Sequence, residues 1–254
     1  MRLSWRIIAI IALLLAMGTA ELMAQSMPQV SISIGGQTTD GKGLSTTLQI
    51  VLLLTVLALA PSILVMTTSF IRIVIVMSFL RQALGTNQLP PSQLIMGISL
   101  VMTVFVMTPV ATQINNNALQ PYLKGEISQT EFFETGVKPL REFMLKQTRE
   151  KDLALFVKYA GLEKPATRDD IPTHVVVPGF ILSELRTSFQ IAFVIFIPFL
   201  VIDMVVASVL MSMGMMMLPP ILVALPFKIL LFVMVDGWYL IVKSLLESFK
   251  IAGG

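Results

Sequence analysis

The hydrophobic positions of this sequence gather in four long blocks. Each block is dominated by Leu, Ile, Val, Met and Phe and carries few charges, which is typical of helices that lie in a membrane. As a helix, the first block would be roughly 50 Å long, whereas a bilayer has a hydrocarbon core of roughly 30 Å. It is therefore too long for one straight span. The blocks cover residues 48–80, 93–112, 188–210 and 218–242.

Every block contains an internal proline. Proline removes one backbone donor and clashes with the preceding turn, so the freed carbonyl in a lipid-facing helix is costly unless another chain or water binds it. Two architectures fit this pattern: four kinked spans, or bent hairpins that pack against one another in an assembly. The residues alone leave both open. The prolines are Pro61, Pro109, Pro198 and Pro226.

The N-terminus has the three parts of a secretory signal: basic residues, an apolar run over residues 7–17, and small residues after it. We expect residues 1–24 to be a signal peptide that is cleaved after Ala20 or Ala24. The alternative is an uncleaved anchor or first spanning helix, but the run is short for a span. Residues 25–45, rich in Gly, Ser, Thr and Gln, predict a flexible lead-in.

Cleavage would leave the mature N-terminus outside the cytoplasm, and alternation across the blocks then sets the topology. The connection between the first two blocks would face the cytoplasm. It is flanked by Arg72 and Arg81, with no acidic residue from there to Pro121, in agreement with the positive-inside rule. The segment between the second and third blocks and the C-terminus would lie outside.

That intervening segment, residues 113–180, predicts short amphipathic helices. Ser128 and Glu131 have the spacing of a capping box. Pro139 is placed to open a second helix, and a third would end at Gly161, a suitable C-cap. Their apolar stripes suit packing against neighbouring copies or other subunits, although a small solvated domain also fits.

The composition narrows the possible functions. With 55% hydrophobic and 13% charged residues and a mean hydropathy of +0.83, the chain has too little charge to cover a soluble globule of 254 residues. It has no cysteine, and His174 is its single histidine, so we expect no metal, no cofactor and no enzyme activity. The net charge of +3, without a basic run that contains aromatics, argues against nucleic acid as a partner.

Four charged residues interrupt the apolar blocks. Each would cost on the order of 3 kcal/mol at a bilayer centre, so we expect these side chains to be buried against a partner or a wet cavity. Structural ion pairs explain them better than a proton relay, but a proton or small-solute transporter remains the alternative function. An intramembrane hydrolase lacks the required nucleophile or paired carboxylates. The residues are Arg72, Asp203, Lys228 and Asp236.

Several motifs together resemble one family. The C-terminal half contains SELRTSFQ, PFLVIDMVVASVL and GMMMLPP, and the N-terminal blocks contain SFIRIVIVMSFLRQALGTNQLPPSQLIMGISLVMTVFVMTPV. From about residue 46 onward the chain is similar to the FliP family of type III secretion proteins. Its signal-like N-terminus points to the flagellar branch, because the injectisome relatives generally lack a cleavable signal.

The resemblance implies an all-α, membrane-associated protein whose kinked helical hairpins, residues 46–112 and 181–254, assemble into a helical pore complex. It implies a core pore-forming subunit of the flagellar export gate, which passes unfolded flagellar proteins across the bacterial inner membrane. The implied place is the flagellar basal body, with a periplasmic portion. The implied partners are other FliP copies, FliQ, FliR, FlhB, unfolded export substrates and membrane lipid.

The resemblance also assigns roles to individual residues. Met215, Met216 and Met217 match a Met-rich loop that lines a constriction of the pore in the family. Methionine suits this role because it is unbranched and polarizable, so a ring of methionines can close when empty and re-pack around an extended peptide. Glu184 and Lys228 are implied to form an ion pair within or between subunits.

Overall fold

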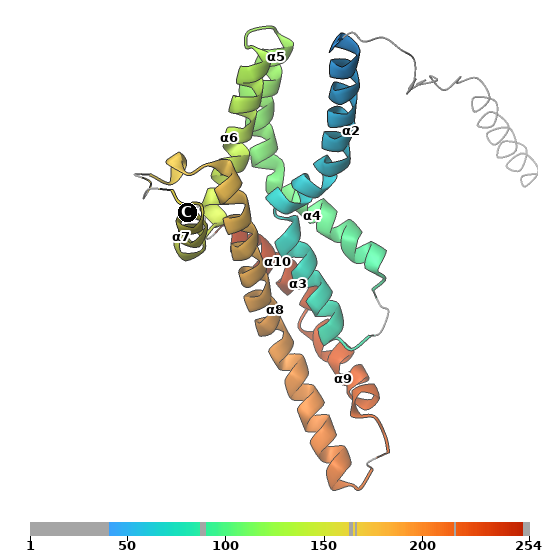
Figure 1. The fold of residues 1–254 in the computed structure, drawn as a ribbon. Coiled ribbons are helices and arrows are strands. Elements are labelled where there is room, and N and C mark those ends of the chain that lie inside the picture. The colour runs from blue at the N-terminus through green and yellow to red at the C-terminus, as the bar shows by residue number, and fades with distance from the viewer. Residues whose placement is uncertain (1–40, 87–89, 163–164, 166, 216, 251–254) are drawn as a thin grey trace, which may run out of the picture. The chain divides into compact units, whose positions relative to one another are not determined.

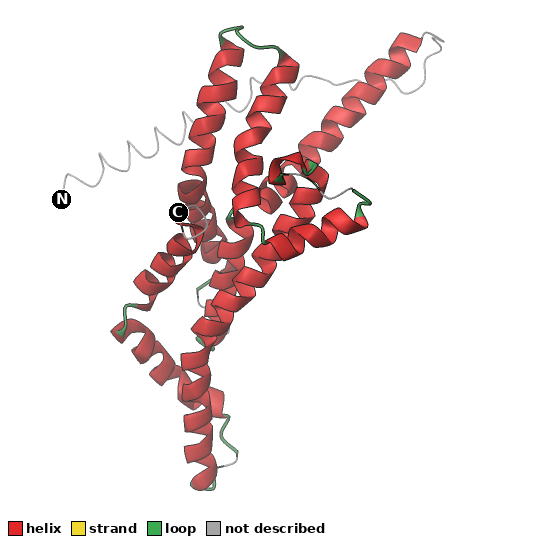
Figure 2. Ribbon diagram, turned by 90° about the vertical axis from the view of Figure 1, so that its left-hand side faces the viewer, coloured by secondary structure: helices red, strands yellow, loops and turns green. Residues whose placement is uncertain are grey.

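The computed structural model describes residues 41–86, 90–162, 165, 167–215 and 217–250 (Figure 1). The signal peptide expected at residues 1–24 and most of the lead-in lie outside the described residues. The described part of the chain consists of helices and turns without a strand (Figure 2). This confirms the all-α prediction. The chain divides into two units, Met1–Leu53 and Leu54–Gly254, and the packing described below is that of the second.

The first apolar block forms two helices, α2 (Gly41–Thr67) and α3 (Phe70–Ala83). This confirms that the block is not one straight span. Hydroxyls compete with the helical ladder at the break: the Thr68 Oγ1 hydroxyl donates to the Val65 carbonyl at 3.5 Å, and the Phe70 amide donates to Thr68 Oγ1 at 3.4 Å. Most apolar side chains of α2 from residue 48 on are exposed, whereas α3 buries one face.

The second block continues beyond its expected end. The helix α4 (Ser92–Ile114) leads without interruption into a π-helical turn, η2 (Asn115–Leu119), and α5 (Gln120–Leu123). The chain then turns back through α6 (Gln129–Gln147), which packs against α4 and η2.

The amphipathic segment follows the prediction in part. The Glu131 amide donates to the Ser128 side chain at 3.3 Å at the start of α6, which is one of the two bonds of the expected capping box. The prediction that Pro139 opens a helix is wrong, because Pro139 lies buried inside α6 and packing retains the helix through it. The helix α7 (Glu150–Tyr159) ends just before Gly161, which has a φ of 66° and confirms the expected C-cap.

The long helix α8 is the element on which the others pack. After a 3-10 turn, η3, it runs from Thr173 to Ser212, earlier at its start than the expected boundary at residue 181. Helices α3, α6 and α7 contact α8, and α9 (Pro220–Met234) returns beside its C-terminal half (Figure 1). The last helix, α10 (Gly237–Lys250), is bent by 64° from α9. The turn η3 covers Arg168–Asp170.

Among the described residues, three helical stretches are long and apolar enough to cross a membrane, and the bent α9–α10 pair would be a fourth if it counts as one span. This supports a membrane-associated protein. The prolines of the four apolar blocks all lie inside continuous helices: Pro61 in α2, Pro109 in α4, Pro198 in α8 and Pro226 in α9. The side of the membrane on which the amphipathic helices lie stays a prediction.

Candidate functional site

The Met-rich turn joins α8 to α9 at the tip of their hairpin (Figure 1). The end of α8 is closed by backbone bonds: the amide of Gly214 donates to the Met211 carbonyl at 3.1 Å, and that of Met215 donates to the Leu210 carbonyl at 3.0 Å. Gly214 has a φ of 75°, a left-handed conformation that glycine adopts without strain. A tight helix end therefore holds the start of the turn in place.

Methionine side chains of this turn face solvent in the single chain. Met213 is 67% exposed, Met215 is 39% exposed and Met217 is 99% exposed. Met216 lies outside the described residues. Exposed apolar side chains at a hairpin tip are not part of this chain's own core, so packing within the subunit does not explain them.

A partly buried ion pair lies farther along the same hairpin. Lys228 of α9 is 2% exposed, and its Nζ donates to Asp203 Oδ2 of α8 at 2.6 Å and to the carbonyl of Ala83 at 3.1 Å. Ala83 is the last residue of α3, where the helix dipole favours a positive charge. Lys228 thus links α9, α8 and the C-terminal end of α3.

A second buried charge cluster surrounds Arg72 near the start of α3. Its Nε donates to Glu184 Oε2 at 2.8 Å, and its Nη2 donates to Glu184 Oε1. The other N–H groups reach the Gln147 side chain at 2.9 Å and, from Nη1, the carbonyl and hydroxyl of Ser248 at 3.1 and 3.0 Å. The guanidinium carbon also lies 4.0 Å from the centroid of the Phe249 ring.

This arrangement gives every N–H donor of the Arg72 guanidinium a hydrogen-bond acceptor. Arginine has five N–H donors, and the five hydrogen bonds of Arg72 use them all. Arg72 is 2% exposed and Glu184 is fully buried, so both charges are shielded from water. The cluster joins α3, α6, α8 and α10 and acts as a fixed point of the fold.

The predicted pair between Glu184 and Lys228 is not formed within the chain. Glu184 is bound by Arg72, and Lys228 is bound by Asp203. The separation along α8 explains this: Glu184 and Asp203 lie roughly 28 Å apart at 1.5 Å per residue, and α9 carries Lys228 to the level of Asp203. The sequence shows that these charged residues lie in apolar surroundings. It does not show how far the helices are shifted along one another, and this shift decides which charges pair.

The expected burial of the embedded charges holds for some of them. Arg72 is buried, whereas the Asp203 side chain is 36% exposed and its Oδ1 accepts no hydrogen bond. Asp236 is exposed in the single chain, so the prediction that it is buried is not met here. It has a φ of 51° at the bend between α9 and α10. Contact of Asp236 with another subunit stays a prediction.

A third polar network fixes α7 on α8, and its carboxylate, Asp152 of α7, lies outside the candidate spans. Asp152 Oδ2 accepts from the Ser183 hydroxyl at 2.7 Å and from Arg149 Nε and Nη2 at 3.0 and 2.6 Å. Burial alone would raise the pKa of Asp152, but the Ser183 hydroxyl and the bonds and charge of Arg149 outweigh it and lower the pKa from 3.8. Sequence reasoning missed this network.

No group of three or more His, Cys, Asp and Glu side chains that could hold a metal ion occurs among the described residues. The charges that a transporter would use are also not gathered in one place. Lys228 and Asp203 bind each other, and Asp236 lies exposed at the bend between α9 and α10. The arrangement therefore offers buried ion pairs and an exposed apolar turn.

Comparisons with known proteins all point to one family. The family model described as "FliP family" matches residues 53–245. The Flagellar biosynthetic protein FliP of Bacillus subtilis is 57% identical over 210 residues, covering 83% of this chain and 95% of the relative. Those of Caulobacter vibrioides and Aquifex aeolicus are 47% and 45% identical; the matches cover 97% and 94% of this chain, and 92% and 99% of the relatives.

Proposed function

Because the chain belongs to the FliP family, we propose that it is a core pore-forming subunit of the flagellar type III secretion export gate. In this role it passes unfolded flagellar proteins across the bacterial inner membrane at the flagellar basal body, and the segment 113–180 lies in the periplasm. The observation that carries the proposal is the exposed Met-rich turn at the tip of the α8–α9 hairpin.

The mechanism uses the chemistry of this turn. Several copies of the chain bring Met215, Met216 and Met217 together around the export path. Unbranched thioether side chains pack against one another when the path is empty, and an apolar constriction of this kind resists water and ions. They re-pack around a passing peptide because they change rotamers at low cost.

The exposed apolar faces of α8 and α9 support assembly with other subunits. Phe193, Met204 and Val233 are 69%, 63% and 69% exposed in the single chain, and apolar surface of this extent requires cover by lipid or protein. We assign this cover to further copies of the chain, to FliQ and FliR, and to FlhB at the cytoplasmic side.

The test is a triple variant in which Met215, Met216 and Met217 are replaced by alanine. We expect normal assembly, because Met215 and Met217 lie outside the buried core. We also expect leakage of ions or a small dye across the inner membrane, because the constriction is wider. The measurement is a conductance or dye-leak assay together with native electrophoresis of the complex.

The matched control replaces Leu64, Val65 and Met66 by alanine. These three adjacent apolar side chains are exposed, at 59%, 39% and 49%, and lie in α2, outside the turn and outside the faces of α8 and α9. The control variant should retain a tight membrane. The proposal is wrong if the triple variant assembles, holds the membrane tight and exports at the normal rate.

A further inference from the structure

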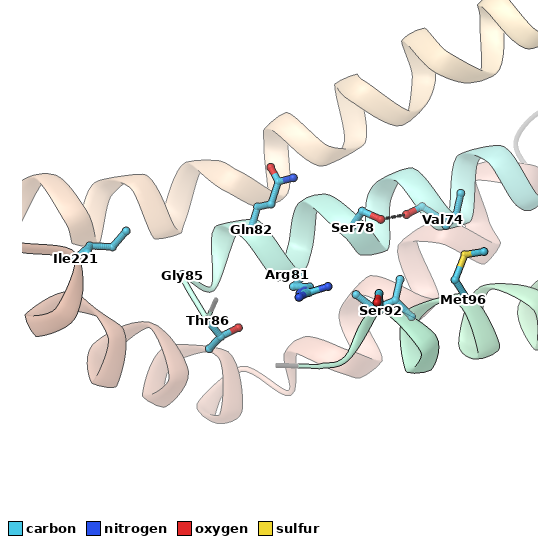
Figure 3. Close-up of a pocket in the computed structure, with 10 residues that line it drawn as sticks. Val74, Ser78, Arg81, Gln82, Gly85, Thr86, Ser92, Met96 and Ile221 are labelled. Atoms are coloured by element: carbon cyan, nitrogen blue, oxygen red, sulfur yellow. Dashed lines mark hydrogen bonds between the residues drawn. The ribbon is translucent and has the colours of Figure 1, made fainter. Parts of the chain in front are cut away.

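A cavity of about 490 Å³ lies between the C-terminal half of α3, the first turns of α4 and the start of α9. Its lining residue Ile221 follows the Met-rich turn in the chain, but neither Met215 nor Met217 lines the cavity, and the proposed export mechanism does not use it. Figure 3 shows Arg81 of α3 extending toward Ser92 at the start of α4, whereas Gln82 points to the opposite side of α3 in this view. One part of the cavity wall is polar, and the rest is apolar.

The polar part favours an anion. Arg81, Thr86 and Ser92 supply a guanidinium and two hydroxyls, and the amino-terminal end of α4 lies at the cavity. No residue that lines the cavity is acidic, and the sequence contains no Asp or Glu between Asp40 and Glu126. A guanidinium has five donors, so Arg81 can bind a ligand oxygen and keep contacts within the chain.

Arg81 is the one charged residue among the described residues that line the cavity. A Cβ atom at Gly85, which also lines the cavity, would lie 3.6 Å from Lys228 Nζ. Lys228 forms an ion pair with Asp203 at 2.6 Å. Arg81 therefore supplies the charged group of the lining.

The apolar part favours a ligand with hydrocarbon chains. Met96 of α4 and Ile221 of α9 line the cavity and are 52% and 55% exposed. A candidate membrane span also begins at Ser92, at the edge of the cavity. If this helix crosses the bilayer, its first residue lies at the depth of the lipid headgroups.

We propose that this cavity binds the headgroup of an anionic phospholipid, with Arg81 on the phosphate and the acyl chains along the apolar surface beside Met96. Arginine forms forked, charge-assisted hydrogen bonds to phosphate oxygens, and helix amino-terminal ends add to the attraction. The bound lipid then contacts α3, α4 and α9 at the same time and holds them together near the connection between the first two apolar blocks.

The experiment measures lipid binding by native mass spectrometry of the full chain in mild detergent. The probes are phosphatidylglycerol, phosphatidylcholine and inorganic phosphate, each titrated separately. We expect preferential retention of phosphatidylglycerol and a loss of its affinity of at least roughly tenfold in Arg81→Gln. The matched control is Lys124→Gln, which removes an exposed positive charge outside the cavity and should change the affinity little.

A second variant tests the cavity itself and does not depend on the folding of Arg81→Gln. Met96→Trp fills the apolar part without changing the charge and should also weaken phosphatidylglycerol binding. The proposal is overturned if both cavity variants bind phosphatidylglycerol as the parent does, or if Lys124→Gln loses as much affinity. Equal retention of phosphatidylcholine overturns the anionic preference. Binding of inorganic phosphate, but not of phosphatidylglycerol, overturns the lipid assignment.

Discussion

Replacing Glu184 by glutamine tests the buried Arg72 cluster most directly. Glutamine has nearly the same shape, but one of its two terminal groups is a donor, so it cannot accept both bonds that Arg72 now makes to Glu184. The variant leaves the Arg72 charge buried without its counterion. Gln147 and Ser248 still accept from Arg72 but bring no negative charge.

The expected loss is large because both members are shielded, at 2% and 0% exposure of the side chains. Removal of one member of a buried pair costs about 3–5 kcal/mol. At about 1.4 kcal/mol per tenfold, this lowers the folding equilibrium constant by roughly two to four orders of magnitude. The double variant Arg72→Leu with Glu184→Leu should be no less stable than Glu184→Gln alone, because no unpaired charge remains.

The assay is a denaturant titration of the purified protein in mild detergent, followed by fluorescence of Trp238. The matched control is Glu247→Gln, since Glu247 forms an exposed pair with Lys243 at 3.9 Å that should contribute only about 0–1 kcal/mol. A loss in Glu184→Gln no larger than that of the control would refute the reasoning.

A charge exchange separates the two possible partners of Glu184. Glu184→Lys together with Lys228→Glu would restore a direct pair between these residues. In the observed structure the exchange instead places a lysine beside Arg72 and a glutamate beside Asp203. The doubly exchanged variant should therefore be less stable than either single one, and recovery would contradict the pairing described above.

Two further predictions concern other parts of the fold. Because the pKa of Asp152 is lowered in the folded protein, its ionised form stabilises the contact of α7 with α8 above about pH 3.8, and this contribution is lost as the pH falls through the folded-state pKa. Amide exchange in α7 should then be faster in Asp152→Asn than in the parent at neutral pH, and the difference should shrink below about pH 4; a constant difference would contradict this. Gly237→Ala should destabilise the α9–α10 bend by about 1–3 kcal/mol, because the new Cβ would lie 2.2 Å from the Phe232 ring. Both variants are measured by thermal unfolding. The control Gly97→Ala, with no atom within 4 Å of its new Cβ, should have a neutral or stabilising effect. Equal effects of the two substitutions would rule out the steric explanation.

Features that depend on neighbouring residues could be predicted from the sequence. The cap at Ser128, the helix end at Gly161 and the apolar character of the long helices follow from local chemistry, and the structure contains them. Pro139 was misplaced because a proline at a helix start and a proline inside a packed helix look alike in sequence. Only contacts with other helices distinguish the two cases.

The pairing of charges could not be predicted for a related reason. The sequence identifies Arg72 and Lys228 as cations in apolar surroundings, but each has a carboxylate available on α8, at Glu184 and at Asp203. Which cation meets which carboxylate depends on how far α3 and α9 are shifted along α8. That shift is set by packing over many residues, so no local motif encodes it.

The positions of the two pairs also explain why the Met-rich turn can be altered without unfolding the subunit. Arg72 holds the start of α3 against α8, and Lys228 holds its end, so the charges that fix the fold lie on both sides of α3. From Asp203, α8 continues for roughly 14 Å to the turn, at 1.5 Å per residue, and carries largely exposed apolar side chains. Substitutions of Met215 and Met217 therefore remove neither a buried charge nor a core side chain. A leak in the triple methionine variant would then report on the constriction between subunits, because the fold of each subunit is secured elsewhere.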